Sequence, residues 1–193
     1  VGTAGSISLV YQSLAPALAF ARDKTLIEIT GGTDTHLAPL ASYIMQVFLP
    51  TIACMGFNGS AAVVRHGFYP EGGGAMRFES IPVKQLHSIN LSERGALKKI
   101  VGESVVANLP KEIAERQKTS VLKKLVEKSI GAKIEVKQVQ AIGKGTYLFL
   151  LAQFENSLAG FSSLGALGKP AEKVGEEAAS ELIGFLEGSV SYI

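Results

Sequence analysis

Hydrophobic residues in the first part of the chain follow two spacings, and the spacing changes at clusters of glycine and proline. Apolar residues recur every three or four positions in two stretches, which indicates amphipathic helices. Short runs rich in β-branched residues lie between and after these stretches and indicate strands. The expected elements are a helix over Ser6–Arg22, a strand over Thr25–Thr30, a helix from Pro39 to about Gly56, and strands over Ala61–Arg65 and Ala75–Ser80.

This order of elements becomes a βαβαββ unit when one strand is placed before it. Such a unit packs two helices on one face of a four-stranded sheet, so the expected fold class is α+β. The chain begins with Val1 rather than methionine and continues directly into a helix. We therefore interpret it as an internal piece of a longer protein that lacks the first strand.

The second half of the chain is richer in lysine and glutamate, and its pattern predicts a separate small α+β module. We place domain boundaries near residues 80–85 and 163–169, and we expect the last helix to carry a stripe of Val174, Ala178, Leu182 and Phe185. The expected elements are strands over Leu86–Leu91 and Leu97–Val106, a helix over Pro110–Ile130, strands over Lys133–Val139 and Thr146–Glu155, and a helix over Pro170–Glu187.

Composition excludes several classes of protein. The 193 residues are 47% hydrophobic and 19% charged, which is enough for one large or two small domains with a real core. The mean hydropathy is high at +0.25, but no segment reads as a membrane span. A net charge of +2 is too small to establish a nucleic-acid partner. The single cysteine excludes an internal disulfide and, with no visible secretory signal, favours the cytoplasm.

Two glycine-rich segments, residues 31–39 and 66–74, combine permissive backbone with aromatic and ionisable side chains. Consecutive glycines allow a left-handed backbone and close approach of another chain or a ligand. A third segment, residues 2–6, lies at the expected start of a helix, where unpaired N–H groups can bind an anion. The spacing favours the simpler reading, a tight strand-to-helix turn with a capping serine, because it matches no known phosphate-binding fingerprint.

Polar residues in these segments leave the chemistry open. Gln12 is an amide among apolar residues, so it either bonds to backbone or faces a ligand. Asp34 can fix its own turn, and His36 can be a base, a ligand or merely solvated. The two further histidines, His66 and His87, are read in the same way, and no histidine or cysteine has metal-ligand spacing. Lysines between residues 111 and 137 form either a phosphate-binding face or a solvated, salt-bridged surface.

The motifs Gly-Gly-Thr-Asp at 31–34 and Gly-Phe-Tyr-Pro-x-Gly-Gly-Gly at 67–74 together resemble the RNA 3'-terminal phosphate cyclase family. The resemblance also includes residues 2–6, Gln12, and the segments 38–39, 93–95, 102–103, 109–110 and 114–116. It implies repeated βαβαββ units with an inserted small α+β domain. The chain then divides into part of the large repeat domain (1–82), the insert (83–165) and a helix that returns to the large domain (166–193).

The resemblance also implies a reaction. In this family ATP forms a histidine–AMP adduct, AMP passes to an RNA 3'-phosphate, and the neighbouring 2'-OH closes a 2',3'-cyclic phosphate. The implied cofactors are ATP and a divalent metal ion, Mg or Mn. The implied partners are an RNA 3' end and ATP, without a membrane, and a homo-oligomer stays open.

Two site residues carry over from the family, and both are expected to bind ATP. Gln12 matches a glutamine at the ATP site, and Pro39 matches a proline that packs on adenine. None of the three histidines matches the nucleophile, which is expected beyond Ile193, so this chain alone is expected to be inactive. Ser42 stands where the family usually has an aspartate, which weakens the expected polar contacts of that helix.

Two other readings stay open. A non-catalytic cyclase-like protein acting in ribosomal RNA processing shares the fold and lacks the nucleophile. An enolpyruvyl transferase shares the repeat architecture, although the glycine-rich turn at 67–74 argues against it.

Overall fold

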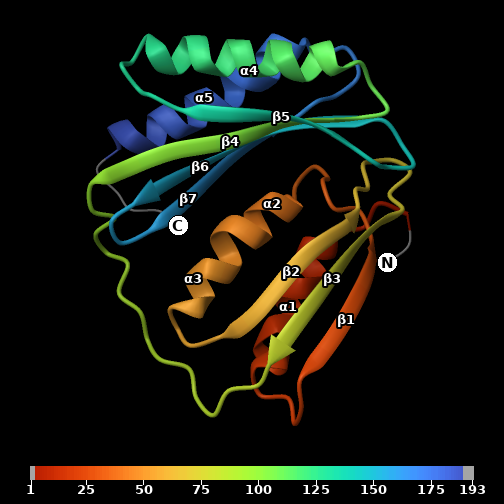
Figure 1. Cartoon of the computed structure of the whole chain (residues 1–193), viewed down its shortest axis with the longest axis vertical. Helices are drawn as coiled ribbons and strands as arrows, with labels where there is room; N and C mark the ends of the chain where they lie inside the picture. Colours follow the sequence, from red (N-terminus) through yellow and green to blue (C-terminus); the bar gives the residue numbers. More distant parts are fainter. Residues whose placement is uncertain (1–2, 189–193) are drawn as a thin grey trace. The chain divides into compact units, whose positions relative to one another are not determined.

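The computed structural model describes residues 3–188, and the chain divides into two compact units (Figure 1). Unit 1 contains Val1–Ile89 and Gln140–Gly143, and unit 2 contains Asn90–Val139 and Lys144–Ile193. Each unit combines a β-sheet with helices, so the expected α+β class is confirmed. No helix in the described range is both long enough and apolar enough to span a membrane.

Unit 1 follows the predicted order of helix, strand, helix, strand and strand. Its elements are α1 (Ile7–Ala19), β1 (Thr25–Gly31), α2 (Ala41–Tyr43), a π-helical turn η1 (Ile44–Phe48), α3 (Leu49–Ala53), β2 (Asn58–Arg65) and β3 (Gly74–Ile81). The strand order is β1-β3-β2, and β3 is antiparallel to both neighbours. The Ser6 side chain accepts a hydrogen bond from the Leu9 N–H at 3.2 Å, which confirms Ser6 as the N-cap of α1.

The core of unit 1 forms where α1 packs on the sheet. Tyr11 is fully buried and stacks on Phe78 of β3, with ring centroids 3.9 Å apart. Ile7, Ile44 and Met76 are also fully buried in this cluster. Aromatic rings of this size contribute much of the apolar area that a small core can remove from water.

The second helical segment begins later than predicted and is not a regular helix. Pro39 lies outside it, and α2 begins at Ala41, whose N–H donates to the Thr33 carbonyl at 3.0 Å. The π-helical turn precedes Pro50. Because proline has no N–H to donate, the regular hydrogen-bond ladder is interrupted there, and a wider turn absorbs the mismatch.

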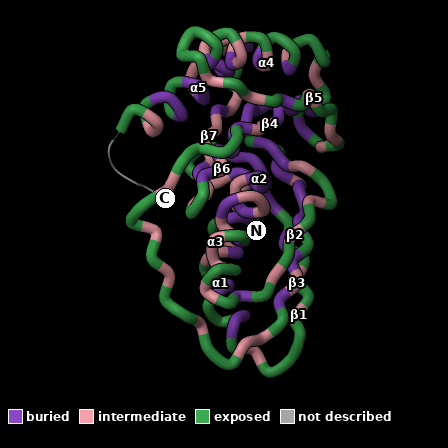
Figure 2. The backbone as a smooth tube through the Cα atoms, turned by 60° about the vertical axis from the view of Figure 1, so that its left-hand side comes forward, coloured by how far each residue is buried: buried purple, intermediate pink, exposed green. Residues whose placement is uncertain are grey.

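Unit 2 is a four-stranded sheet covered by two helices. Its elements are β4 (Leu97–Ala107), α4 (Lys111–Val126), β5 (Lys133–Val139), β6 (Gly145–Phe154), β7 (Leu158–Leu164) and α5 (Ala171–Glu187). The strand order is β5-β4-β6-β7, and β4 and β5 are parallel because α4 crosses over between them. Strand β6 is buried along nearly its whole length (Figure 2), as expected for a central strand.

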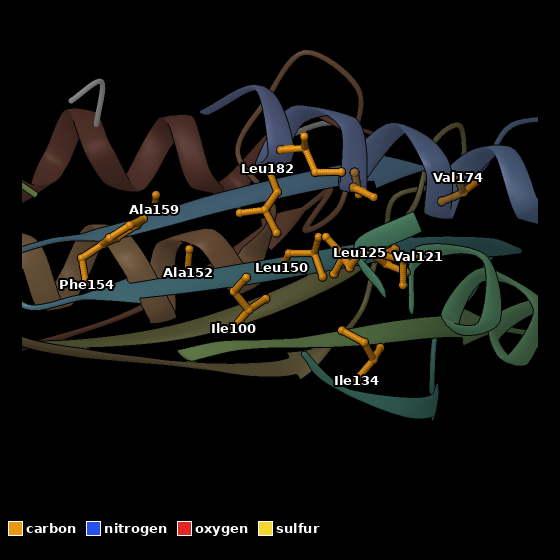
Figure 3. Close-up of a cluster of buried hydrophobic side chains, with 14 residues drawn as sticks. Ile100, Val121, Leu125, Ile134, Leu150, Ala152, Phe154, Ala159, Val174 and Leu182 are labelled. Carbon is orange, nitrogen blue, oxygen red and sulfur yellow. The ribbon is translucent and has the colours of Figure 1, made fainter. Parts of the chain in front are cut away.

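Apolar side chains of both helices meet the sheet in one cluster (Figure 3). Val121 and Leu125 come from α4, Val174 and Leu182 from α5, and Leu150 from β6. Gly175 allows the two helices to approach closely, because a Cβ at this position would lie 2.5 Å from the Gln117 carbonyl oxygen. The predicted apolar stripe of the last helix is therefore real.

The packing of α5 differs from the expected domain division. The helix lies against α4 and the four-stranded sheet, so 166–188 stay with unit 2 instead of returning to the large domain. The remaining residues of that range, 189–193, lie outside the described residues. The unit boundary falls at residues 89–90, a few positions later than predicted. The apolar stripe on α5 indicates that one face of the helix is buried, but it does not indicate against which domain that face packs.

One predicted strand does not form, and one strand that does form is not predicted. Leu86–Leu91 is not a strand, because it pairs with no neighbouring strand; its His87 N–H instead donates to the Met55 carbonyl at 2.8 Å. Strand β7 was not predicted, because alanine, glycine and serine weaken its alternation. It forms as the second arm of a hairpin with β6.

Candidate functional site: two glycine-rich loops at the start of a helix

The two glycine-rich segments singled out in the sequence lie against each other in unit 1. The N–H groups of Thr33 and Asp34 both donate to the Gly67 carbonyl, at 2.9 and 3.2 Å, and the Gly67 N–H donates to the Thr33 hydroxyl at 2.9 Å. A Cβ on Gly67 would lie 2.4 Å from the Gly74 nitrogen and 2.6 Å from the Gly31 oxygen. Both neighbours are backbone atoms, so only glycine fits at this crossing.

Asp34 is the polar centre of this crossing. Asp34 is only 1% exposed, and its side chain accepts hydrogen bonds from the Thr33 hydroxyl at 2.7 Å and the Ala41 N–H at 3.4 Å. The His66 Nδ1 lies 2.7 Å from the Asp34 Oδ2, and the His66 side chain is 15% exposed. Asp34 therefore ties together both glycine loops and the start of α2.

The sequence analysis does not predict the contact between His66 and Asp34. The sequence leaves His66 open as a base, a ligand or a solvated side chain, and it suggests for Asp34 only a turn within its own loop. The two residues are far apart in the chain, and no local spacing signals their contact. A carboxylate beside an imidazole orients the ring and fixes which nitrogen carries a proton.

The segment that precedes α1 lies against the same loops. The Ile7 N–H donates to the Gly32 carbonyl at 3.0 Å, and the Gly32 N–H donates to the Gly5 carbonyl at 2.8 Å. Gly72 has a left-handed φ of +63°, and a Cβ there would lie 2.0 Å from the Thr3 oxygen. Three segments that are separate in sequence therefore converge at the start of α1. Gly2, from the first motif, lies outside the described residues.

A cavity of about 400 Å³ opens where these segments meet. Its wall is formed by Ala4 and Ser6 before α1, by Leu9 in the first turn of α1, by the loop from Thr35 to Ala38, and by Tyr69. The volume falls within the range of small-molecule sites, about 300–1,000 Å³. His36 was expected to be solvated or chemically active; it is exposed and lines this cavity.

The two predicted ATP-binding residues lie next to this cavity in the chain but not in its wall. Gln12 is half-buried on α1, one turn after the lining residue Leu9, and its side chain has no hydrogen bond within residues 3–188. Pro39 is half-buried and follows the lining residue Ala38. The cavity thus does not bring Gln12 and Pro39 together, and their role stays a prediction.

Two hydroxyl groups near Gln12 are buried and, within residues 3–188, have no hydrogen-bond partner. They belong to Ser8 and Tyr11, which are both fully buried on α1. Burial raises the pKa of Tyr11 to about 12, because the charged phenolate would lose its hydration. Unpartnered buried hydroxyls are uncommon, since each costs on the order of 1–3 kcal/mol.

Three of the seven lysines between residues 111 and 137 form ion pairs within the described part of unit 2. Lys111 pairs with Glu115, Lys128 with Glu187, and Lys137 with Glu103. The Glu103 carboxylate holds the pKa of Lys137 above its usual value through a 2.6 Å hydrogen bond. These pairs offset part of the positive charge that a phosphate-binding face would need.

Comparisons with known proteins identify the family. The family model described as RNA 3'-terminal phosphate cyclase matches residues 1–187. An RNA 3'-terminal phosphate cyclase of Ignicoccus hospitalis is 41% identical over 189 residues, covering 95% of this chain and 54% of the relative. The proteins of the same name from Pyrobaculum aerophilum and Methylococcus capsulatus are 39% identical over 193 residues and 38% identical over 183 residues. These two alignments cover 99% and 94% of this chain, and 56% and 51% of the relatives.

The chain spans about half the length of the curated relatives it matches. The match runs through both units and includes both glycine-rich loops. This confirms the resemblance seen in the motifs at 31–34 and 67–74, and the chain belongs to the RNA 3'-terminal phosphate cyclase family.

Proposed function

We propose that this chain is part of an enzyme that uses ATP to convert an RNA 3'-terminal phosphate into a 2',3'-cyclic phosphate. The observation that carries the proposal is the family match over residues 1–187, together with the glycine loops that its motifs form. The relatives are named as cyclases, which supports the enzyme over a non-catalytic cyclase-like protein.

The proposed chemistry proceeds through two covalent intermediates. A histidine nitrogen attacks the α-phosphorus of ATP, and pyrophosphate leaves. An oxygen of the RNA 3'-phosphate then attacks the AMP phosphorus and displaces the histidine. The neighbouring 2'-OH finally attacks the 3'-phosphorus, its proton is lost, and AMP leaves. Adenylylation supplies the leaving group that a phosphate lacks, and the 2'-OH is already close to the phosphorus.

Within this chain we assign binding rather than covalent chemistry. The Gln12 amide is proposed to hydrogen-bond ATP, and the Pro39 ring to pack on the adenine. The nucleophilic histidine is proposed to lie outside this chain. His66 is already engaged with the buried Asp34 carboxylate, and its contacts serve the loop crossing.

A divalent ion, Mg or Mn, is proposed to accompany the triphosphate and offset its charge. No group of three or more His, Cys, Asp or Glu within residues 3–188 is arranged to hold a metal ion. These residues therefore do not fit a protein cage for the ion, and none of the steps above is assigned to it. An ion of this kind commonly binds through phosphate oxygens and few protein groups.

ATP binding tests the assignment of Gln12 and Pro39. A fluorescent ATP analogue would be titrated with the 193-residue chain, with Gln12→Ala and with Pro39→Ala. Loss of one hydrogen bond predicts about 2- to 12-fold weaker binding for Gln12→Ala. Gln85→Ala is the matched control, because this glutamine is exposed. Equal affinities for all four proteins would refute the assignment.

Adduct formation tests where the nucleophile lies. The chain would be incubated with α-labelled ATP and separated on a denaturing gel, and we expect no labelled band. A band that persists in His36→Gln and disappears in His66→Gln would assign the nucleophile to His66 and overturn our mapping.

A further inference from the structure

We propose that the cavity at the start of α1 binds the terminal base of a single-stranded RNA by stacking it on Tyr69. The inference rests on the proposed function, because an RNA 3' end is the substrate of that reaction. It adds a site that neither the family motifs nor the comparisons assign. The evidence comes from the aromatic wall, from the way this wall is held, and from its position beside the predicted ATP residues.

Two rings from different loops line the cavity. Tyr69 is 70% exposed, although it belongs to a well-packed turn, and His36 is exposed on the other loop. Leu9 and Leu37 add apolar surface. Unstacked RNA bases are commonly bound between aromatic or histidine rings, and a purely apolar ligand would not require these two ring types.

The main chain beside Tyr69 is fixed by packing and hydrogen bonds. Phe68, next to Tyr69, is 3% exposed and forms a β-bridge with Asp34, and its carbonyl accepts the Gly72 N–H at 2.7 Å. On the other loop Leu37 is fully exposed and has a left-handed φ of +61°. A bulky residue rarely adopts this conformation, and such strain is typical of functional loops. The main chain that carries Tyr69 is therefore already ordered, which reduces the ordering cost of binding.

The place of the cavity favours an RNA base over the adenine of ATP. Its wall contains Leu9 and Ala38 but neither Gln12 nor Pro39. In the proposed reaction the RNA 3'-phosphate must reach the phosphorus of AMP, so the last nucleotide has to lie beside the ATP site. Leu9, one turn from Gln12 on α1, and Ala38, beside Pro39 in the loop, both line the cavity. The cavity therefore meets this requirement.

The test uses the full 193-residue chain and a short single-stranded RNA with a 3'-phosphate and 2-aminopurine as its last base. Stacking on Tyr69 quenches 2-aminopurine fluorescence, and binding is measured in the same titration. For Tyr69→Ala we expect about 5- to 150-fold weaker binding and loss of the quench. Tyr69→Phe keeps the ring and should restore both. Phe20→Ala is the matched control, because Phe20 is 57% exposed at the other end of α1.

Each outcome decides between the alternatives. RNA binding that is unchanged in Tyr69→Ala overturns this inference and leaves the proposed function standing. Weaker binding of the ATP analogue, with RNA binding unchanged, assigns the cavity to ATP and also overturns the inference. If the wild-type chain binds neither RNA nor ATP, the proposed function fails for this chain and the inference fails with it. Since Tyr69 is exposed, circular dichroism should show an unchanged fold in both variants.

Discussion

Replacing Asp34 by asparagine tests whether one buried carboxylate fixes the glycine-rich loops. The side chain keeps its shape, but one of its two acceptor oxygens becomes an NH₂ group. Asp34 now accepts from Thr33, His66 and Ala41, and an amide cannot accept from all three. When His66 carries its proton on Nδ1, its N–H and that of Ala41 point at different oxygens of Asp34, so one of them faces the NH₂ group inside a site that is 1% exposed.

The expected loss of stability follows from these contacts. Hydrogen bonds to a charged acceptor contribute about 1.5–3 kcal/mol and neutral ones about 0.5–1.5 kcal/mol, so two retained bonds weaken by about 1 kcal/mol each. An unsatisfied buried N–H costs a further 1–3 kcal/mol or so. Because the amide is neutral, the variant no longer has the cost of burying a charge, and this gain offsets part of the loss. We expect Asp34→Asn to lower the free energy of unfolding by about 2–4 kcal/mol.

Urea unfolding followed by circular dichroism measures the global effect, and amide hydrogen exchange of Gly67 measures the local one. The Gly67 N–H bonds across the loops to Thr33, so its exchange should accelerate in the variant. The chain contains only one other aspartate, Asp23, which is exposed. Asp23→Asn is thus an internal control, with an expected change within about 0.5 kcal/mol. Equal urea midpoints for the two variants would refute the reasoning.

Three further predictions follow from single groups. Burial raises the pKa of Tyr11 to about 12, so this group ionises at lower pH in the unfolded chain than in the folded one. The free energy of unfolding should therefore fall by roughly 2–3 kcal/mol between pH 10 and 12. Urea titrations at alkaline pH should show no such loss for Tyr11→Phe. In Gly72→Ala the new Cβ would lie 2.0 Å from the Thr3 oxygen, so the melting temperature of this variant should fall by several degrees. Gly131→Ala is the control, because no atom lies within 4 Å of its new Cβ, and its melting temperature should not fall. The Arg94 guanidinium donates to two backbone carbonyls in the last turn of α5 and so caps that helix. Arg94→Met should therefore speed amide hydrogen exchange in the last turn of α5, and unchanged exchange would contradict the capping role.

Local signals in the sequence predicted the elements that depend on local physics. The cap at Ser6 and the apolar spacing placed α1 within a few residues, and the β-branched run placed β1 within one residue. Helix α4 ended four residues before the predicted end, because Ser129 adopts a left-handed φ of +58° ahead of the expected stop at Gly131. Ends of helices depend on single residues that can take this conformation, so they are less predictable than helix centres.

Contacts between distant segments could not be predicted in the same way. The glycine motifs indicated close backbone approach, which Gly67 confirms, but not which segments approach. The pairing of Asp34 with His66 and the exposure of Tyr69 beside His36 depend on how two loops cross. A single sequence carries no signal for such crossings, because every residue involved is also common in ordinary loops.

Within residues 3–188, strands β1 and β2 each pair with one neighbour in the three-stranded sheet of unit 1. Their outer sides therefore offer backbone groups with no inter-strand partner in that sheet, next to exposed Leu26 and Val64. Further strands can be added on either side by new hydrogen bonds alone, with β3 undisturbed at the centre. The sheet is in this sense an extendable module, which can lengthen laterally without rebuilding its interior.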